Sequence, residues 1–354
     1  MKRKWLKVLM LAMMAGASFL SNPASRGKRH EEAEGTTLFK RIQRNNNLGC
    51  QTYPQFRYTR RDAMSTLSRR DLIKTALSGV TAASLPLPSS GNGERQSAPV
   101  QRKGRIRQSV ARWCYKDIPL DKLCAYGAEI GLKAVDLLNP DEYEVPARYG
   151  LVCSMGYASG GDIANALNRV ENHAKIEEGF RKYIPLAAKA GVPNVITFSG
   201  NRNGMSDEEG AKNTILGLNR VKKIGEDHGV TICLELLNSK VNHKDYMCDR
   251  TAWGAQVVQA VNSPHVKLLY DIYHMQIMEG DLISTIQKNI EWIAHFHTGG
   301  VPGRHELDGT QEVEWDGVMR GIAATNFRGY VAHEFVPSRD PLSSLRQAVD
   351  LCDV

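Results

Sequence analysis

The stretch "TICLELLNSKVNHKDYMCDRTAWGAQVVQAVNSPHVKLLYDIYH", residues 231–274, contains two apolar runs separated by a helical pattern. The runs "TICLELLN" (231–238) and "VKLLYDIYH" (266–274) contain few polar residues, as expected of strands that are buried on both faces. Between them, "RTAWGAQVVQAV" (250–261) spaces its apolar residues as a helix does. The stretch therefore predicts two parallel strands joined by a crossover helix.

The same alternation continues in both directions along the chain. Further strand-like segments lie at 108–113, 133–138, 151–158, 194–200, 293–300 and 329–337. Helical patterns lie at 120–131, 171–191, 207–229, 281–293, 315–326 and 340–352, and several end in Gly, as helices commonly do. The segment between 133–138 and 151–158 is too short for a full helix and contains proline, so this crossover is expected to be degenerate.

Eight strands that alternate with helices over about 245 residues predict an α/β protein of the (β/α)8 barrel type. A doubly wound parallel sheet is the alternative, but no G-x-G-x-x-G motif follows the first strand-like segment. The seven cysteines form no C-x-x-C pair, which argues against a zinc cluster or a disulfide framework.

The net charge of +8 is unevenly distributed along the chain. Residues 1–107 carry 21 Lys and Arg against 6 Asp and Glu, whereas residues 108–354 carry 25 against 32. The predicted barrel is therefore acidic, with a net charge of −7, so nucleic acid is not an expected partner. No apolar run reaches the roughly 18 residues of a spanning helix, so stable membrane insertion is not expected either.

The basic N-terminal region is expected to be poorly ordered and to precede the barrel at 108–354. Residues 1–63 begin like a secretory signal and are interpreted as an upstream extension or signal-like segment, with Met64 as an alternative start. Residues 64–88 resemble a twin-arginine export signal around Arg69 and Arg70, although an ordinary amphipathic helix would show a similar pattern. Residues 89–107 are typical of a flexible linker. This order predicts export to the periplasm, with the cytoplasm as the alternative.

Four consecutive strand ends of the predicted barrel carry polar residues within apolar runs. They are Glu235, Asp271, His297 and Glu334, separated by 36, 26 and 37 residues, about one strand–helix unit each. The carboxyl ends of barrel strands meet at one face, so these side chains are expected to lie close together. Singly, Asp271 could instead cap a helix and His297 could be a core histidine.

Three carboxylates in one partly buried site repel one another unless a cation neutralises them. Oxygen ligands with one imidazole favour Mn²⁺ or Mg²⁺, while Co²⁺ and Zn²⁺ also fit such a site. His274 is expected on a loop just above Asp271, as a substrate-binding residue. Arg304, His305 and Glu306 lie in the Gly-rich segment "GGVPGRHELDG" (299–309), which suits an anionic small molecule or, alternatively, is a solvated turn. The segment 238–249 is predicted to be a lid, with Lys240 and His243 as weaker candidates.

The strand-end motifs resemble those of a known family. "LELLN" (234–238), "YDIYHMQ" (270–276), "HFHTGGVPGRHE" (295–306) and "HEF" (333–335) are similar to motifs of the hydroxypyruvate isomerase branch of the xylose isomerase-like TIM barrel superfamily. The resemblance covers about 245 residues, from about residue 108 to the C-terminus. It implies that Glu235, Asp271, His297 and Glu334 bind a divalent metal and that the two glutamates are catalytic.

The resemblance implies an intramolecular oxidoreductase of the aldose–ketose isomerase type. Proton transfer by the glutamates through a metal-stabilised enediolate would convert hydroxypyruvate into tartronate semialdehyde, with Arg304 pairing with the substrate carboxylate. Well-known bacterial hydroxypyruvate isomerases carry Gln where this chain has His297, whereas ketose 3-epimerases and inosose-type enzymes carry His. A ketose 3-epimerase or an inosose-type dehydratase therefore stays an alternative.

Two further classes compete with the isomerase. A metal-dependent endonuclease acting on abasic DNA would need additional histidines and a basic groove, which the acidic barrel does not favour. A non-catalytic exported sugar-binding module would tolerate loss of a glutamate, yet both glutamates are present. The expected partner is a small keto acid or sugar, and formation of a homo-oligomer stays open.

Overall fold

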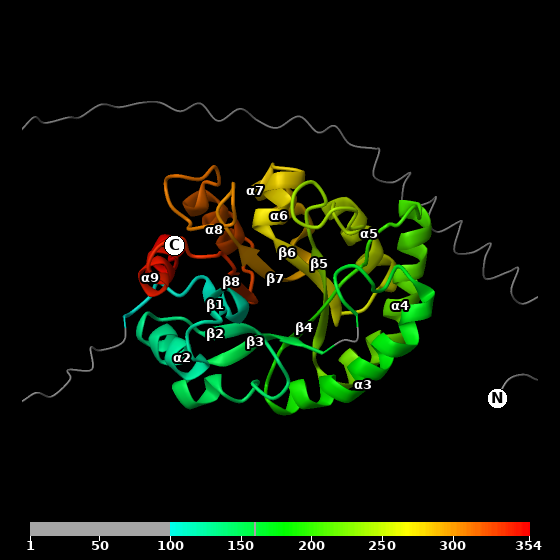
Figure 1. The fold of residues 1–354 in the computed structure, drawn as a ribbon, viewed down its shortest axis with the longest axis horizontal. Coiled ribbons are helices and arrows are strands. Elements are labelled where there is room, and N and C mark those ends of the chain that lie inside the picture. The colour runs from blue at the N-terminus through cyan, green and yellow to red at the C-terminus, as the bar shows by residue number, and fades with distance from the viewer. Residues whose placement is uncertain (1–99, 159–160) are drawn as a thin grey trace, which may run out of the picture. The chain divides into compact units, whose positions relative to one another are not determined.

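The computed structural model describes residues 100–158 and 161–354. Within them, eight parallel strands close into one barrel in chain order, and β1 pairs with β8 (Figure 1). The strands are β1 (Arg107–Ala111), β2 (Ala134–Leu138), β3 (Val152–Tyr157), β4 (Asn194–Thr197), β5 (Thr231–Leu236), β6 (Val266–Asp271), β7 (Ile293–Thr298) and β8 (Tyr330–His333). The predicted (β/α)8 barrel is confirmed, and the doubly wound alternative is wrong because the sheet is closed.

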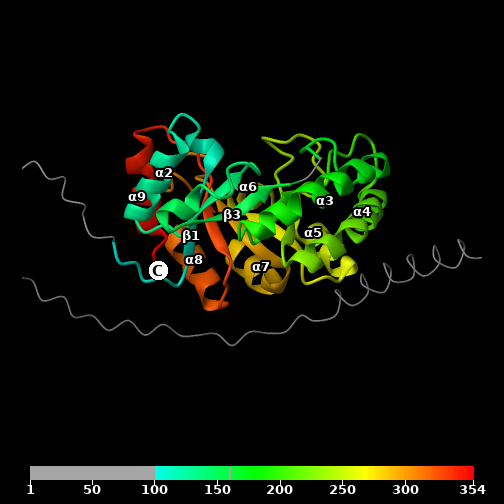
Figure 2. The same ribbon diagram turned by 90° about the horizontal axis from the view of Figure 1, so that it is seen from below.

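The helices surround the strands on the outside of the barrel (Figures 1 and 2). They are α2 (Leu120–Glu129), α3 (His173–Lys189), α4 (Asp207–His228), α5 (Thr251–Val261), α6 (Ile272–Met278), α7 (Leu282–Asn289), α8 (Trp315–Ala324) and α9 (Pro341–Leu351). Between β2 and β3 the chain forms only a short 3-10 helix, η2 (Pro146–Tyr149). The second crossover is therefore degenerate, as predicted.

Glycines end the first three of these helices in the way the sequence predicted. Gly131, Gly191 and Gly229 follow α2, α3 and α4 with φ angles of 91°, 72° and 66°. A residue with a side chain is strained in this left-handed region, whereas glycine adopts it freely. Each glycine therefore lets the chain turn from the helix towards the next strand.

The end of β6 corrects one prediction. The apolar run 266–274 is predicted as a strand whose end at Asp271 leads into a loop that carries His274, but β6 ends at Asp271 and α6 begins at Ile272. Asp271 is the N-cap of α6, and its Oδ1 accepts a hydrogen bond of 3.0 Å from the backbone N–H of His274. A short buried helix and a buried strand give the same apolar run, so periodicity did not separate them. His274 thus lies on a helix rather than on a loop.

Strand register brings the predicted site residues to one level. Asp271 and His297 are directly paired residues of β6 and β7. Glu334 follows the last residue of β8, and its backbone N–H donates to the carbonyl of Thr298 at the end of β7 at 3.0 Å. Glu235 is the penultimate residue of β5, which pairs with β6. All four therefore stand at the carboxyl ends of neighbouring strands.

The signal-like segment 1–63, the twin-arginine-like segment 64–88 and residues 89–99 of the predicted linker lie outside the described residues. From Arg102 onward the chain is attached to the barrel, because Arg102 donates to the Ile130 carbonyl at 2.7 and 2.9 Å and pairs with Asp350 at 2.6 Å. The backbone N–H of Lys103 donates to Asp353 at 2.9 Å. In the described part of the chain, no helix has both the length and the apolar character needed to span a bilayer.

Candidate active site

Four predicted side chains meet at the carboxyl ends of β5 to β8. Glu235, Asp271, His297 and Glu334 each contribute one ligand atom, and these atoms lie within 4.8 Å of one another. All four residues are buried, and Glu235 and Glu334 retain an exposed fraction of only 4%. We call these four residues the strand-end cluster.

His297 lies at the centre of the strand-end cluster. Its Nδ1 is 2.7 Å from Glu334 Oε2, 3.4 Å from Glu235 Oε1 and 3.9 Å from Asp271 Oδ2. Among the described residues, no hydrogen bond of normal geometry satisfies this nitrogen. Nδ1 therefore faces the three carboxylates, in a position where it could act as a metal ligand together with them.

The electrostatics of the cluster favour an additional cation. Burial raises the pKa values of Glu235 and Asp271 above their usual range. Burial also disfavours the charge on Glu334, but Arg304 and His297 outweigh it and hold the pKa of Glu334 well below its usual value. Three adjacent carboxylates cannot all ionise cheaply in a buried site, so an additional positive charge would stabilise them together.

The donor set fits a divalent metal ion. Three carboxylates and one imidazole with a free Nδ1 provide the oxygen-rich set that Mg²⁺ and Mn²⁺ prefer, and Co²⁺ and Zn²⁺ accept the same atoms. The fully buried His297 and Asp271 provide fixed ligand positions. The residues present therefore could hold a divalent cation, and the set by itself does not select one metal.

His274 lies beside the cluster with one nitrogen directed to it. Its Nδ1 accepts a hydrogen bond of 3.0 Å from the backbone N–H of Asn238, so the ring proton resides on Nε2. Nε2 has no hydrogen-bond partner among the described residues and lies 3.6 Å from Asp271 Oδ2. Burial lowers the pKa of His274 well below its usual value, which keeps the ring neutral. His274 can thus donate one hydrogen bond to a molecule bound at the cluster.

Arg304 reaches the cluster from the connection between β7 and α8. Its backbone adopts the left-handed conformation, with φ at 59°. Its Nη2 lies 2.5 Å from Glu334 Oε2 and 3.2 Å from Asp271 Oδ2. The guanidinium packs over the rings of Trp113 and Tyr273, each centred 5.3 Å away. The predicted position of Arg304 at the site agrees with these contacts.

Trp113 was not predicted from the sequence. It follows β1, and its Nε1 donates to Glu334 Oε1 at 2.5 Å. With an exposed fraction of 38%, it is one of the larger apolar side chains left open to solvent. The only signal in the sequence was a tryptophan at the end of a strand-like run, which is equally typical of a core residue.

The structure does not bring His305 and Glu306 into the cluster. His305 is exposed, and its Nδ1 lies 2.9 Å from the carbonyl oxygen of Val336. The Glu306 carboxylate accepts hydrogen bonds from the N–H of Ser338 at 2.9 Å, from its hydroxyl at 2.7 Å and from the Ser344 hydroxyl at 2.9 Å. Glu306 therefore ties the connection after β7 to the segment between β8 and α9.

Lys240 also points away from the cluster, because its Nζ donates to the Ile277 carbonyl on α6 at 2.9 Å. The His243 ring lies tilted against that of His274, with ring centres 5.2 Å apart. The predicted lid segment is thus attached to α6 at several points, since Asn242 also accepts a hydrogen bond of 2.8 Å from the Tyr273 hydroxyl.

Asp136 is a second residue that sequence reasoning missed. It lies on β2, fully buried, and its Oδ2 is 2.8 Å from Nε2 of His297. Burial opposes its ionisation, but His295 and His297 lower the pKa of Asp136 to about 2. An acid inside the apolar run "KAVDLL" was the available signal, and it was of the same kind as the signal that identified Asp271.

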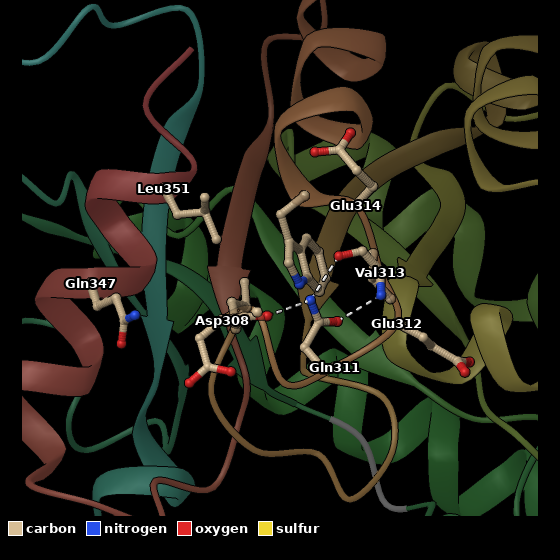
Figure 3. Close-up of a pocket in the computed structure, with 10 residues that line it drawn as sticks. Asp308, Gln311, Glu312, Val313, Glu314, Gln347 and Leu351 are labelled. Carbon is tan, nitrogen blue, oxygen red and sulfur yellow. Dashed lines mark hydrogen bonds between the residues drawn. The ribbon is translucent and has the colours of Figure 1, made fainter.

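A separate pocket of about 470 Å³ lies between residues 307–315 and α9 (Figure 3). Gln311 organises this segment, since its Nε2 donates to the carbonyls of Asp308 and Val313 at 3.0 and 2.7 Å. No residue of the strand-end cluster lines this pocket. The pocket is therefore separate from the strand-end cluster.

A closed barrel with acidic and imidazole ligands at the carboxyl ends of its strands defines a TIM barrel with a candidate metal-assisted active site. Residues 144–353 match the sequence profile of the family described as Xylose isomerase-like TIM barrel. The chain belongs to this family, which confirms the resemblance found in the sequence motifs.

Several curated relatives carry isomerase names. The 2-oxo-tetronate isomerase of Cupriavidus necator is 27% identical over 229 residues, which cover 62% of this chain and 87% of that protein. The hydroxypyruvate isomerase of Escherichia coli is 32% identical over 114 residues, 31% of this chain and 44% of that protein. These relatives support the predicted isomerase class of enzyme.

Many solved structures share the fold. One is described as AP endonuclease, family 2, from Brucella melitensis, with a TM-score of 0.60, 24% identity, and coverage of 68% of this chain and 97% of that one. The other is the 3-keto-D-glucoside 4-epimerase from E. coli, with a TM-score of 0.60, 17% identity, and coverage of 70% and 98%. At these identities the likeness concerns the barrel fold.

Proposed function

We propose that this chain is a divalent-metal-dependent isomerase that converts hydroxypyruvate into tartronate semialdehyde. The observation that carries the proposal is the meeting of two glutamates, from β5 and β8, with Asp271 and His297, their ligand atoms all within 4.8 Å. An isomerase of this kind needs two proton-transferring groups beside one charge-stabilising centre. The isomerase names of the relatives support the same reaction class.

Each residue of the site has its own role in the proposed reaction. A divalent cation held by the strand-end cluster would stabilise the negative charge that develops on the substrate oxygens. One glutamate takes the proton from the hydroxymethyl carbon, and a proton is returned to the former carbonyl carbon, while the hydroxyl proton passes from one oxygen to the other. His274 donates a hydrogen bond to a substrate oxygen, and Arg304 pairs with the substrate carboxylate.

A ketose 3-epimerase or an inosose-type enzyme is the second candidate. The presence of His297, whose Nδ1 completes the cluster, favours it, since the sequence motifs of such enzymes carry His at this position. In the epimerase, one glutamate would remove the proton and the other would return a proton to the opposite face of the same carbon. The substrate would be a neutral sugar or polyol, so Arg304 would have no carboxylate to bind.

Proton exchange in D₂O tests the proposal. The full chain, stripped of metal and reloaded with Mn²⁺ or Mg²⁺, is incubated with hydroxypyruvate and followed by proton NMR after removal of the metal. Metal-dependent C–H exchange together with tartronate semialdehyde is the expected result. Exchange with a ketose or inosose but not with hydroxypyruvate would move the assignment to the second candidate. Exchange with neither class of substrate would contradict the catalytic role.

We also infer that the chain is exported through the segment around Arg69 and Arg70. Tagging the C-terminus and fractionating cells should place the wild-type protein in the periplasm and the double variant Arg69→Lys, Arg70→Lys in the cytoplasm. Equal distribution of both proteins would contradict export by a twin-arginine route.

A further inference from the structure

A second polar group lies inside the barrel beneath the strand-end cluster. It consists of Asp136 on β2, His295 on β7, Ser154 on β3 and Ser109 on β1, and every one of these side chains has an exposed fraction of 0%. Barrel interiors are usually filled by branched apolar residues, and a buried carboxylate is costly unless its oxygens are satisfied. The presence of a carboxylate in this buried group therefore requires a physical explanation.

Asp136 connects this group to the cluster. Its Oδ1 accepts a hydrogen bond from the Ser154 hydroxyl at 2.7 Å and lies 3.1 Å from Nε2 of His295. Its Oδ2 lies 2.8 Å from Nε2 of His297. Ser154 in turn lies 2.7 Å from the hydroxyl of Ser109. The carboxylate is thus contacted directly from β3 and β7, and Ser109 of β1 reaches it only through Ser154.

The contact between Asp136 and His297 selects one nitrogen of the imidazole. An ionised carboxylate only accepts hydrogen bonds, so the Nε2 of His297 that faces it must keep its proton. A protonated ring nitrogen cannot bind a metal ion. The lone pair can therefore form only at Nδ1, the nitrogen that faces Glu235, Asp271 and Glu334.

We propose that Asp136 is the positioning residue that makes Nδ1 of His297 the metal-binding atom, and that His295 and Ser154 hold its carboxylate in place. This inference rests on the proposed metal-dependent function, because it assigns a role towards the ion that the cluster would hold. A carboxylate behind a ligating histidine fixes the ring and increases its basicity, and loss of such a partner typically weakens metal binding about 10–100-fold.

His295 has its own part in this arrangement. It precedes His297 by two residues, so both rings project from the same face of β7 into the barrel. Neither of its nitrogens has a hydrogen bond of normal geometry among the described residues. Its closest charged neighbour is Asp136, which places His295 as a second support for the same carboxylate.

Metal affinity of the full chain tests the inference. The dissociation constant for Mn²⁺ is measured by competition with a chromophoric chelator for the wild type, for Asp136→Asn and for the matched control Glu312→Gln. The control makes the same carboxylate-to-amide change at an exposed residue that belongs to neither buried group. We expect Asp136→Asn to bind Mn²⁺ about 10–100-fold more weakly and Glu312→Gln to stay within about threefold of the wild type.

A folded Asp136→Asn variant that binds Mn²⁺ as tightly as the wild type would overturn the role of Asp136 alone. A wild-type protein that binds no Mn²⁺ would contradict the proposed function instead. A second measurement reads the protonation of His297 in the wild type and needs no variant of Asp136. The wild type is labelled with ¹⁵N-histidine, loaded with Mg²⁺ and studied by NMR, and His297→Gln is used to assign the His297 signals. We expect Nε2 of His297 to be protonated and Nδ1 to be unprotonated. A protonated Nδ1 with an unprotonated Nε2 would overturn the inference.

Discussion

The strand-end cluster and the β7–α8 loop (residues 299–314) both carry charged and imidazole side chains, but they direct them differently. In the cluster, four side chains from four strands converge on one point. In the loop, Arg304 turns towards Glu334, whereas its neighbours His305 and Glu306 turn to Val336 and Ser338.

The difference has a geometric cause. Strand residues alternate between two faces, and register sets their level, so a position in a strand specifies where its side chain points. In the loop, the direction depends on single dihedral angles, such as the φ of 59° at Arg304. Residue type and spacing therefore predict function better at strand ends than in the loop.

The largest expected effect separates the cluster from the loop directly. Glu235→Gln and Glu334→Gln should each lower the rate of C–H exchange by about 10³-fold, because each removes a proton-transferring carboxylate. The matched control is Glu312→Gln, an exposed carboxylate of the same loop that, among the residues the structure describes, accepts a single side-chain hydrogen bond, of 3.2 Å from Gln276. It should exchange at the wild-type rate, and a comparable loss in this control would erase the distinction between the two regions.

Arg304 provides the next test, as the residue of the loop that contacts the cluster. Arg304→Gln should lower kcat/KM for hydroxypyruvate by about 10²-fold, because it removes the charge that we propose to pair with the substrate carboxylate. For a neutral ketose the loss should stay within about tenfold. Steady-state kinetics measure the decrease in kcat/KM for each of the two substrates. An equal decrease for both would contradict pairing of Arg304 with a substrate carboxylate.

Glu306 should affect stability and its pH dependence rather than catalysis. Burial opposes its charge, but hydrogen bonds from Ser338 and Ser344 lower its pKa to about 2 in the folded protein. The ionised form therefore stabilises the fold above about pH 4.5, and this contribution is lost as the pH falls towards 2.

Urea unfolding of the metal-free protein measures this contribution. The free energy of unfolding of Glu306→Gln should be lower than that of the wild type by on the order of 2 kcal/mol at pH 7. This difference in the free energy of unfolding should decrease between pH 4.5 and pH 2. The exposed Glu312→Gln serves again as the control. A difference in the free energy of unfolding that does not change with pH would show that the charge of Glu306 does not anchor the loop.

The smallest effect is expected at His305. Its side chain is exposed and contacts only the Val336 carbonyl among the hydrogen bonds that the structure describes. His305→Ala should change kcat/KM by less than about threefold, since surface substitutions away from a site have small effects. A tenfold loss in the same kinetic assay would place His305 in the substrate site after all, and would weaken the contrast with Arg304.

Much of the molecule could be predicted because the relevant signals are periodic. Apolar runs separated by helical patterns gave the order of eight strands, and glycines marked the ends of helices. An acid or a histidine at the end of each of four consecutive strands indicated the cluster, because parallel strands of a barrel bring their carboxyl ends together. The helix that begins at Ile272 was not predicted, because a short buried helix resembles a strand in composition.

By itself, then, the sequence determined the barrel and the four residues at its strand ends, since both follow from local pattern and chain order. Only the tertiary structure decided which other side chains reach them. Asp136 meets His297 across the barrel interior from 161 positions away in the chain, and Trp113 meets Glu334 from 221 positions away. Such contacts join strands or turns that are distant in sequence, and they form only when the barrel closes and fixes the direction of each side chain.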